Sequence, residues 1–167
     1  IKIFSDNIFI ATKCDGNHTL YEFCKAVSCI IEHFVKCGYK VRGGITRGGI
    51  FIDDLMIWGK ALVAAYKLES CKAKYPRIIV NQNVAEEVKK TCGKAEWLKK
   101  EEDYHVLDYL RFPGVDANRA IEIVDIALSV LDKEDELDEK IKEKNNYFRK
   151  YLHETKKALL SKKGKSK

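Results

Sequence analysis

Two Gly-Gly pairs five residues apart, Gly43-Gly44 and Gly48-Gly49, are the feature of this sequence that most constrains its fold. Glycine lets the backbone turn with positive φ or approach another group closely, at a cost in chain entropy. Apolar residues after Gly59 recur at helical spacing, and a proline ends that pattern before a strand-like run at 77–80. The segment 40–80 therefore predicts two strands around a glycine-rich loop and a helix. The glycines alone are equally typical of a simple hairpin.

The motifs of this segment, taken in order, resemble the catalytic domain of class III nucleotidyl cyclases. In that family a Gly-Ile-x-x-Gly strand end precedes a turn such as I-W-G and a helix that usually ends in R-L-E-S. The match here covers Val41–Val80, and its most specific parts are Ile57-Trp58-Gly59 and Lys67-Leu68-Glu69-Ser70. The R-G-G-I strand is similar to a bacterial branch that looks related to the pyrimidine cyclases of phage defence. The resemblance implies conversion of a nucleoside triphosphate to a 3′,5′-cyclic nucleotide and pyrophosphate.

The resemblance also implies a metal site. The family holds two divalent ions, Mg²⁺ or Mn²⁺, on two aspartates, and F-S-D-N-I around Asp6 resembles the F-S-D-S-I form of the R-G-G-I branch. By this resemblance Asp6 is a metal ligand, whereas an aspartate between two short β-prone runs is by itself typical of a turn. The family's other metal-binding aspartate lies on an earlier strand. Because the chain begins at Ile1 without a methionine, we expect a fragment that is inactive alone.

Positions for catalysis and base recognition follow from the same resemblance. Lys67 stands where the family has an arginine, and a lysine neutralises phosphate charge without the bidentate fork of a guanidinium. Val63 stands at the position of an asparagine, and valine cannot donate a hydrogen bond. Lys2 and Met56 stand where purine cyclases contact the base. Because the family builds its site across a dimer interface, we expect a nucleoside triphosphate as ligand and a homodimer.

Two arginines flank the glycine pairs. A guanidinium binds phosphate oxygens bidentately, so Arg42 and Arg47, with Gly44 and Gly48 beside them, are candidate triphosphate contacts. Either arginine is also able to pair with the acidic dipeptide Asp53-Asp54, and we favour such an ion pair. Adjacent residues in a strand point to opposite faces, so the dipeptide itself is typical of a turn rather than of a metal-binding pair.

The rest of the pattern predicts an α+β domain with a ferredoxin-like sheet. A capping box at Thr19 and Glu22 opens a strongly amphipathic stretch, which predicts a helix that packs on the sheet. We expect these elements in chain order: a hairpin at 2–12, a helix at 19–37, neighbouring strands at 41–45 and 49–52, a helix at 60–73, a short helix at 83–90 and a strand at 104–110.

A cyclase-like domain at 1–113 and a helical extension at 114–167 are the predicted organisation. Apolar residues recur at helical spacing between 120 and 131, and then at steps of four and seven between 137 and 159 among dense lysines and glutamates. This second pattern is typical of a seam that either folds back on the domain or meets a partner.

Composition excludes some classes of protein. No apolar run approaches the roughly 20 residues that a membrane helix needs, so the sequence predicts a cytoplasmic protein without membrane contact. Six cysteines show no C-x-x-C pairing and no histidine at zinc-ligand spacing, which indicates reduced thiols. Cys24, on the apolar side of the first helix, is expected in the core.

Two other functions stay open at this point. Val63 and Met56 favour a cyclase-like domain that has lost catalysis and binds a nucleotide or a partner as a regulatory module. The net charge of +6 suggests a basic nucleic-acid-binding α+β domain. Against that function, much of the excess charge lies in the last dozen residues, and the predicted strands lack an aromatic pair that stacks bases. Nucleic acid is therefore not the expected partner.

Overall fold

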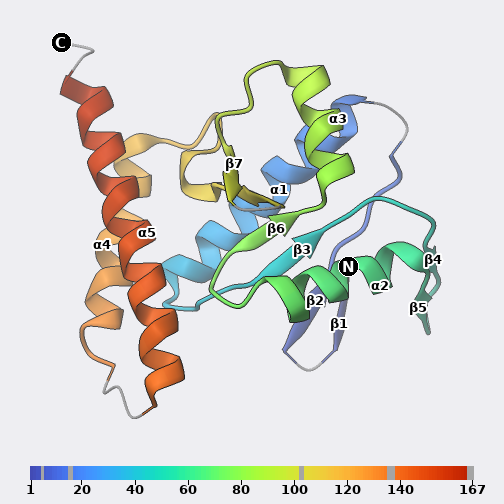
Figure 1. Ribbon diagram of the computed structural model, residues 1–167, viewed down its shortest axis with the longest axis horizontal. Helices are drawn as coiled ribbons and strands as arrows, with labels where there is room; N and C mark the ends of the chain where they lie inside the picture. The colour runs from blue at the N-terminus through green and yellow to red at the C-terminus, as the bar shows by residue number, and fades with distance from the viewer. Residues whose placement is uncertain (5, 15–16, 102–103, 135–137, 165–167) are drawn as a thin grey trace.

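The computed structural model describes residues 1–4, 6–14, 17–101, 104–134 and 138–164. Within these residues the chain has the predicted α+β class, with a mixed four-stranded sheet, two separate hairpins and five α-helices (Figure 1). The helices are α1 (Asn17–Lys36), α2 (Lys60–Lys67), α3 (Gln82–Cys92), α4 (Ala117–Leu131) and α5 (Glu139–Gly164). The strands are β1 (Lys2–Phe4), β2 (Asn7–Phe9), β3 (Gly43–Ile45), β4 (Phe51–Ile52), β5 (Ile57–Trp58), β6 (Ile78–Val80), β7 (Leu98–Glu101) and β8 (Tyr104–Leu107).

The four-stranded sheet has the spatial order β3, β6, β8, β7. β3 is parallel to β6, with Gly44 opposite Ile79, and the other neighbouring pairs are antiparallel. The expected pairing of 41–45 with 49–52 is wrong, because β4 pairs with β5 in a hairpin of its own. β3 and β6 are joined by a connection that contains α2, and such a crossover makes the two strands parallel. The predicted hairpin near the N-terminus is confirmed as β1 and β2.

One face of the sheet packs against α1 and α3. Side chains alternate along a strand, so Ile78 and Val80 of β6 point to the same face. They share one apolar core with Cys24 of α1 and Val84 of α3. The predicted helices at 19–37 and 83–90 are confirmed, and α3 begins where the Asn81 side chain accepts a hydrogen bond from the amide of Asn83.

The opposite face of β3 packs against α2. Gly59 precedes this helix with φ +147°, and a β-carbon there would lie 2.5 Å from the carbonyl oxygen of Gly49, so glycine is required. The predicted helix at 60–73 is α-helical only to Lys67. It continues as a π-helical turn, η1 (Leu68–Lys72), which ends with a 2.8 Å hydrogen bond from the Ala73 amide to the Leu68 carbonyl.

The C-terminal helices fold back on the domain. α4 and α5 pack against each other, and Phe148, Leu152 and Leu159 of α5 are buried. The first two of these join the core that also contains the sheet residues. Contact with the domain, one of the two alternatives for this seam, is therefore confirmed. Figure 1 shows α4 and α5 at one end of the long axis, and the β4–β5 hairpin at the other.

The sheet differs from the prediction at its charged edge. The predicted strand at 104–110 ends at Leu107, and a 3₁₀ turn, η2 (Tyr109–Arg111), follows. β7 was not predicted, because its sequence is Leu-Lys-Lys-Glu and shows no apolar alternation. Among the described residues, no helix is long and apolar enough to cross a membrane. None of the six cysteines, all of which the structure describes, forms a disulfide, and Cys24 is fully buried as expected.

Candidate functional site

Lys2 connects the two small hairpins. Its ammonium donates a 2.7 Å hydrogen bond to the backbone carbonyl of Asp54, a residue 52 positions further along the chain. Asp54 lies two residues before Met56, in the turn that joins β4 to β5. The structure thus brings together Lys2 and the Met56 turn, the two segments that the resemblance assigns to base recognition. Met56 is 49% exposed, so its side chain is open to a ligand.

Asp53 forms the turn itself. Its Oδ1 atom accepts hydrogen bonds from the amides of Leu55 and Met56, at 2.8 and 2.7 Å. These two bonds, the one from Met56 first, hold the pKa of Asp53 below its usual range. The interpretation of this acidic dipeptide as a turn is therefore confirmed.

Asp6 lies in the turn between β1 and β2, where it is exposed. Its Oδ1 atom accepts a 3.0 Å hydrogen bond from the Asn7 side chain. Within the described part of the chain, no group of three or more histidine, cysteine, aspartate or glutamate side chains is arranged to hold a metal ion. Among the described residues, Asp6 is therefore not part of such a group.

Both arginines of the glycine-rich segment form ion pairs. Arg42 Nε lies 2.5 Å from Glu69 Oε1 in η1, and Arg47 pairs with Glu87 of α3. The hydrogen bond to Glu87 raises the pKa of Arg47. The favoured pairing of these arginines with Asp53-Asp54 is therefore wrong, because each guanidinium meets a glutamate instead. A phosphate would have to displace a carboxylate from either guanidinium.

The candidate glycines bring α2 close to the strand. A β-carbon on Gly44 would lie 2.6 Å from the Ala65 carbonyl oxygen and 2.7 Å from Leu68 Cβ, so helix and strand pack here at backbone distance. At Gly48 an added β-carbon would lie 3.5 Å from Ala61 Cβ, an ordinary contact. Gly44 therefore has a packing role, which its assignment to nucleotide binding did not include.

The outer surface of α2 contains the two positions that the resemblance compares with catalytic residues. Val63 is 53% exposed and Lys67 is also exposed, four residues further along the same helix. Residues four apart lie on one face of a helix, so both side chains face the same surface. Lys67 and the exposed Lys60, seven residues earlier on the same helix, are cations that this surface offers to a ligand.

Exposed large apolar side chains are concentrated in α2 and in the two hairpins, and the sequence did not predict this. Large apolar side chains are exposed at fourteen described positions, and eleven of these lie on the hairpins, on α2 or beside them. We call this set the apolar face: Ile1, Ile3, Ile8, Ile50, Phe51, Ile52, Leu55, Met56, Trp58, Val63 and Tyr66. A concentration of exposed large apolar side chains in neighbouring segments is a feature of surfaces where another molecule binds.

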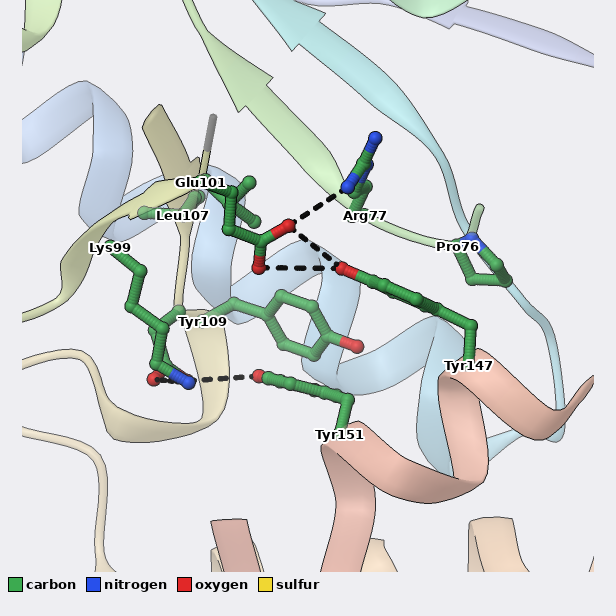
Figure 2. A pocket seen from close by; sticks show the side chains of 10 residues that line it. Pro76, Arg77, Lys99, Glu101, Leu107, Tyr109, Tyr147 and Tyr151 are labelled. Carbon is green, nitrogen blue, oxygen red and sulfur yellow. Dashed lines mark hydrogen bonds and ion pairs between the residues drawn. The ribbon is translucent and has the colours of Figure 1, made fainter. Parts of the chain in front are cut away.

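A polar cluster lies between β7 and α5, far from the apolar face. Figure 2 shows Tyr147 and Tyr151 reaching from α5 toward Glu101 and Lys99. Glu101 accepts from Arg77 at 2.8 Å and from the Tyr147 hydroxyl at 3.2 Å. Burial raises the pKa of Tyr147 to about 12. The cavity at this cluster is about 20 Å³, which is room for a water molecule but not for a substrate. We therefore interpret the cluster as a structural contact that holds α5 on the domain.

Comparison with protein-family models, with curated proteins and with solved structures finds no match to this chain.

Proposed function

We propose that this chain is a nucleotidyl cyclase-like domain that converts a nucleoside triphosphate to a 3′,5′-cyclic nucleotide. The observation that supports this most is the contact between Lys2 and Asp54, because it unites two segments that the resemblance assigns independently to base recognition. The α+β class agrees with this proposal, and a ferredoxin-like relationship of the sheet belongs to the same proposal. A cytoplasmic location is part of the proposal, and it agrees with six described cysteines that form no disulfide.

In the proposed reaction the ribose 3′-oxygen attacks the α-phosphorus. A new oxygen–phosphorus bond forms, the bond between the α-phosphorus and the bridging oxygen breaks, pyrophosphate leaves, and the proton of the 3′-hydroxyl passes to solvent or a base. Lys67 is the residue of this chain that would offset the charge growing on the phosphoryl oxygens. Lys2 and Met56 would contact the base, and Arg42 and Arg47 would exchange their glutamate partners for phosphate oxygens.

Two divalent ions, Mg²⁺ or Mn²⁺, are part of the proposal through the resemblance. Bound ions would activate the attacking oxygen and neutralise phosphate charge. Asp6 would supply one ligand, and its exposed position in a hairpin turn is compatible with that role. The described residues alone do not form a two-ion site, so the second carboxylate would have to come from residues outside this set.

A second copy of the chain is the proposed partner. The apolar face contains Trp58 at 61% exposure and Leu55 at 87%, and large apolar side chains at such exposure favour association. Lys67 and Val63 stand at the same face, so a homodimer formed there would cover the proposed reaction site. The homodimer is therefore part of the proposed function.

A catalytically degenerate module is the second candidate, and Val63 favours it. This exposed valine stands on the surface of α2 where the resemblance has a hydrogen-bond donor, and its side chain offers none. Such a module would bind a nucleoside triphosphate with Lys2 and Lys67 and report it to a partner without chemistry.

The test uses protein expressed from the gene's full reading frame, incubated with Mn²⁺ and each of ATP, GTP, CTP and UTP. We expect a cyclic product from one of them, lost in Asp6→Ala and lowered about 100-fold in Lys67→Ala. Lys90→Ala, an exposed lysine on α3, is the matched control and should leave the rate unchanged.

If no product forms, a measurement of triphosphate binding distinguishes the two candidate functions. Triphosphate binding that is weakened by Lys2→Ala, without product from any of the four, would establish the degenerate module. No product and no triphosphate binding, or binding only to RNA with steep salt dependence, would refute both candidates.

A further inference from the structure

His105 lies in a confined position between β8 and α3. It is 8% exposed and stands in the sheet opposite Lys100 of β7 and Val80 of β6. Its Nε2 atom lies 2.6 Å from the ammonium of Lys89, near the C-terminal end of α3. This contact joins the sheet to the last turns of α3 by a polar bond.

The contact requires a neutral ring. An ammonium group only donates, so Nε2 of His105 must accept, and the ring proton must then reside on Nδ1. Nδ1 is buried and has no hydrogen-bond partner in the described residues. Because the imidazolium form carries a proton on both nitrogens, it has no lone pair left for Lys89.

The charges around His105 also disfavour its protonation. Lys89 and Glu86 face it from α3 and Lys100 faces it from β7, whereas its neighbour on β6 is the apolar Val80. Burial, followed by the charges of Lys89 and Lys100, lowers the pKa of His105, and Glu86 opposes this in part. With two cations and only one carboxylate around it, the positive charge of an imidazolium at this position would not be balanced.

We propose that His105 is an acid-sensitive latch, and that proton uptake at its Nε2 atom breaks the bond to Lys89 and loosens the last turn of α3 against β8. The proton comes from solvent, and no other bond changes. The latch rests on the geometry of α3 and β8 and does not depend on the proposed function.

The sign of the pH effect follows from linkage. The lowered pKa means that the unfolded or released state binds the proton more readily than the latched state. The latch is therefore complete above the ordinary histidine pKa of about 6.5 and weakens as pH falls below it toward the lower pKa of the folded state.

Amide hydrogen exchange tests the latch. We expect the protection of α3 amides, relative to α4 amides and corrected for intrinsic exchange, to fall severalfold between about pH 7.5 and about pH 5.5, the range in which histidine titrates. His105→Gln, which keeps a polar side chain but does not titrate, should remove this fall. His33→Gln is the matched control, because His33 is exposed on α1, and it should behave as the original chain.

A second measurement serves if His105→Gln does not fold. The His105 ring is followed by NMR titration in the original chain and in Lys89→Met, where loss of the neighbouring charge should raise its pKa. An α3 protection that does not change with pH, or a His105 pKa that Lys89→Met does not move, would overturn the proposal.

Discussion

Tyr75 and Tyr147 stack face to face, with ring centroids 4.5 Å apart and ring planes within 10° of parallel. Tyr75 precedes β6, whereas Tyr147 belongs to α5, so the stack joins the sheet to the C-terminal helix. The guanidinium of Arg77 lies 5.5 Å from each of these rings and 4.8 Å from that of Tyr104. Aromatic and cation–π contacts, added to the buried apolar residues of α5, thus hold this helix on the domain.

Tyr147→Ala should destabilise the fold by about 2–3 kcal/mol, because it removes the stack, the contact with Arg77 and partly buried surface. Tyr147→Phe should cost only about 1 kcal/mol, since it keeps the ring and loses the hydrogen bond to Glu101. Urea denaturation measures both. Ile141→Ala, on the exposed surface of the same helix, is the control, and equal losses in the Ala variants at 141 and 147 would argue against the stack as an anchor.

Gly44→Ala should destabilise the protein by about 1–3 kcal/mol, because the new methyl group would overlap the Ala65 carbonyl and Leu68 of α2 and η1. Gly49→Ala is the matched control in the neighbouring glycine pair. A β-carbon at Gly49 meets nothing within 4 Å, and its φ is not positive, so alanine there should be neutral or slightly stabilising. Thermal unfolding of the two variants gives the comparison, and a Gly44→Ala protein as stable as Gly49→Ala would contradict the close packing.

Trp58→Ser should weaken self-association at least about tenfold, because aromatic side chains in the centre of an interface dominate its energy. Sedimentation equilibrium or light scattering across a concentration series measures the change. Tyr39→Ser removes an equally exposed ring away from the apolar face and should leave association unaltered. A chain that is monomeric at all concentrations would remove the homodimer from the proposal.

Cys24 should resist alkylation while the protein is folded. Burial raises the pKa of its thiol to about 12, so almost no thiolate exists near neutral pH, and the side chain is inaccessible. The exposed thiols Cys29, Cys37, Cys71 and Cys92 should react quickly with iodoacetamide. Mass spectrometry of peptides from native and urea-treated protein resolves each site, and rapid labelling of Cys24 in the native state would contradict its burial.

Much of the fold was predictable because its helices have regular apolar periodicity. The repeat from Leu20 to Phe34 marks α1, and the segment after Val115 marks α4, whatever these helices pack against. The strands were less predictable. β7 is charged because it lies at the sheet edge, and the partner of β3 depends on the crossover through α2 rather than on any local pattern.

The candidate site was predictable only in its residue types. The predicted partners of Arg42 and Arg47 were Asp53-Asp54, whereas the observed partners lie 27 and 40 residues away, and no local rule selects Glu69 and Glu87. The contact between Lys2 and Asp54 likewise depends on how two hairpins approach each other in space. The metal and catalytic roles of Asp6 and Lys67 stay predictions.

The charged edge of the sheet has a consequence for solubility. An edge strand offers unpaired backbone groups to any neighbouring chain, and apolar edges promote fibrous aggregates. β7 carries Lys99, Lys100 and Glu101 in succession, so a second copy that extended the sheet in parallel register at this edge would bring like charges side by side. These charges therefore disfavour edge-to-edge pairing of two copies through β7 where the protein is concentrated.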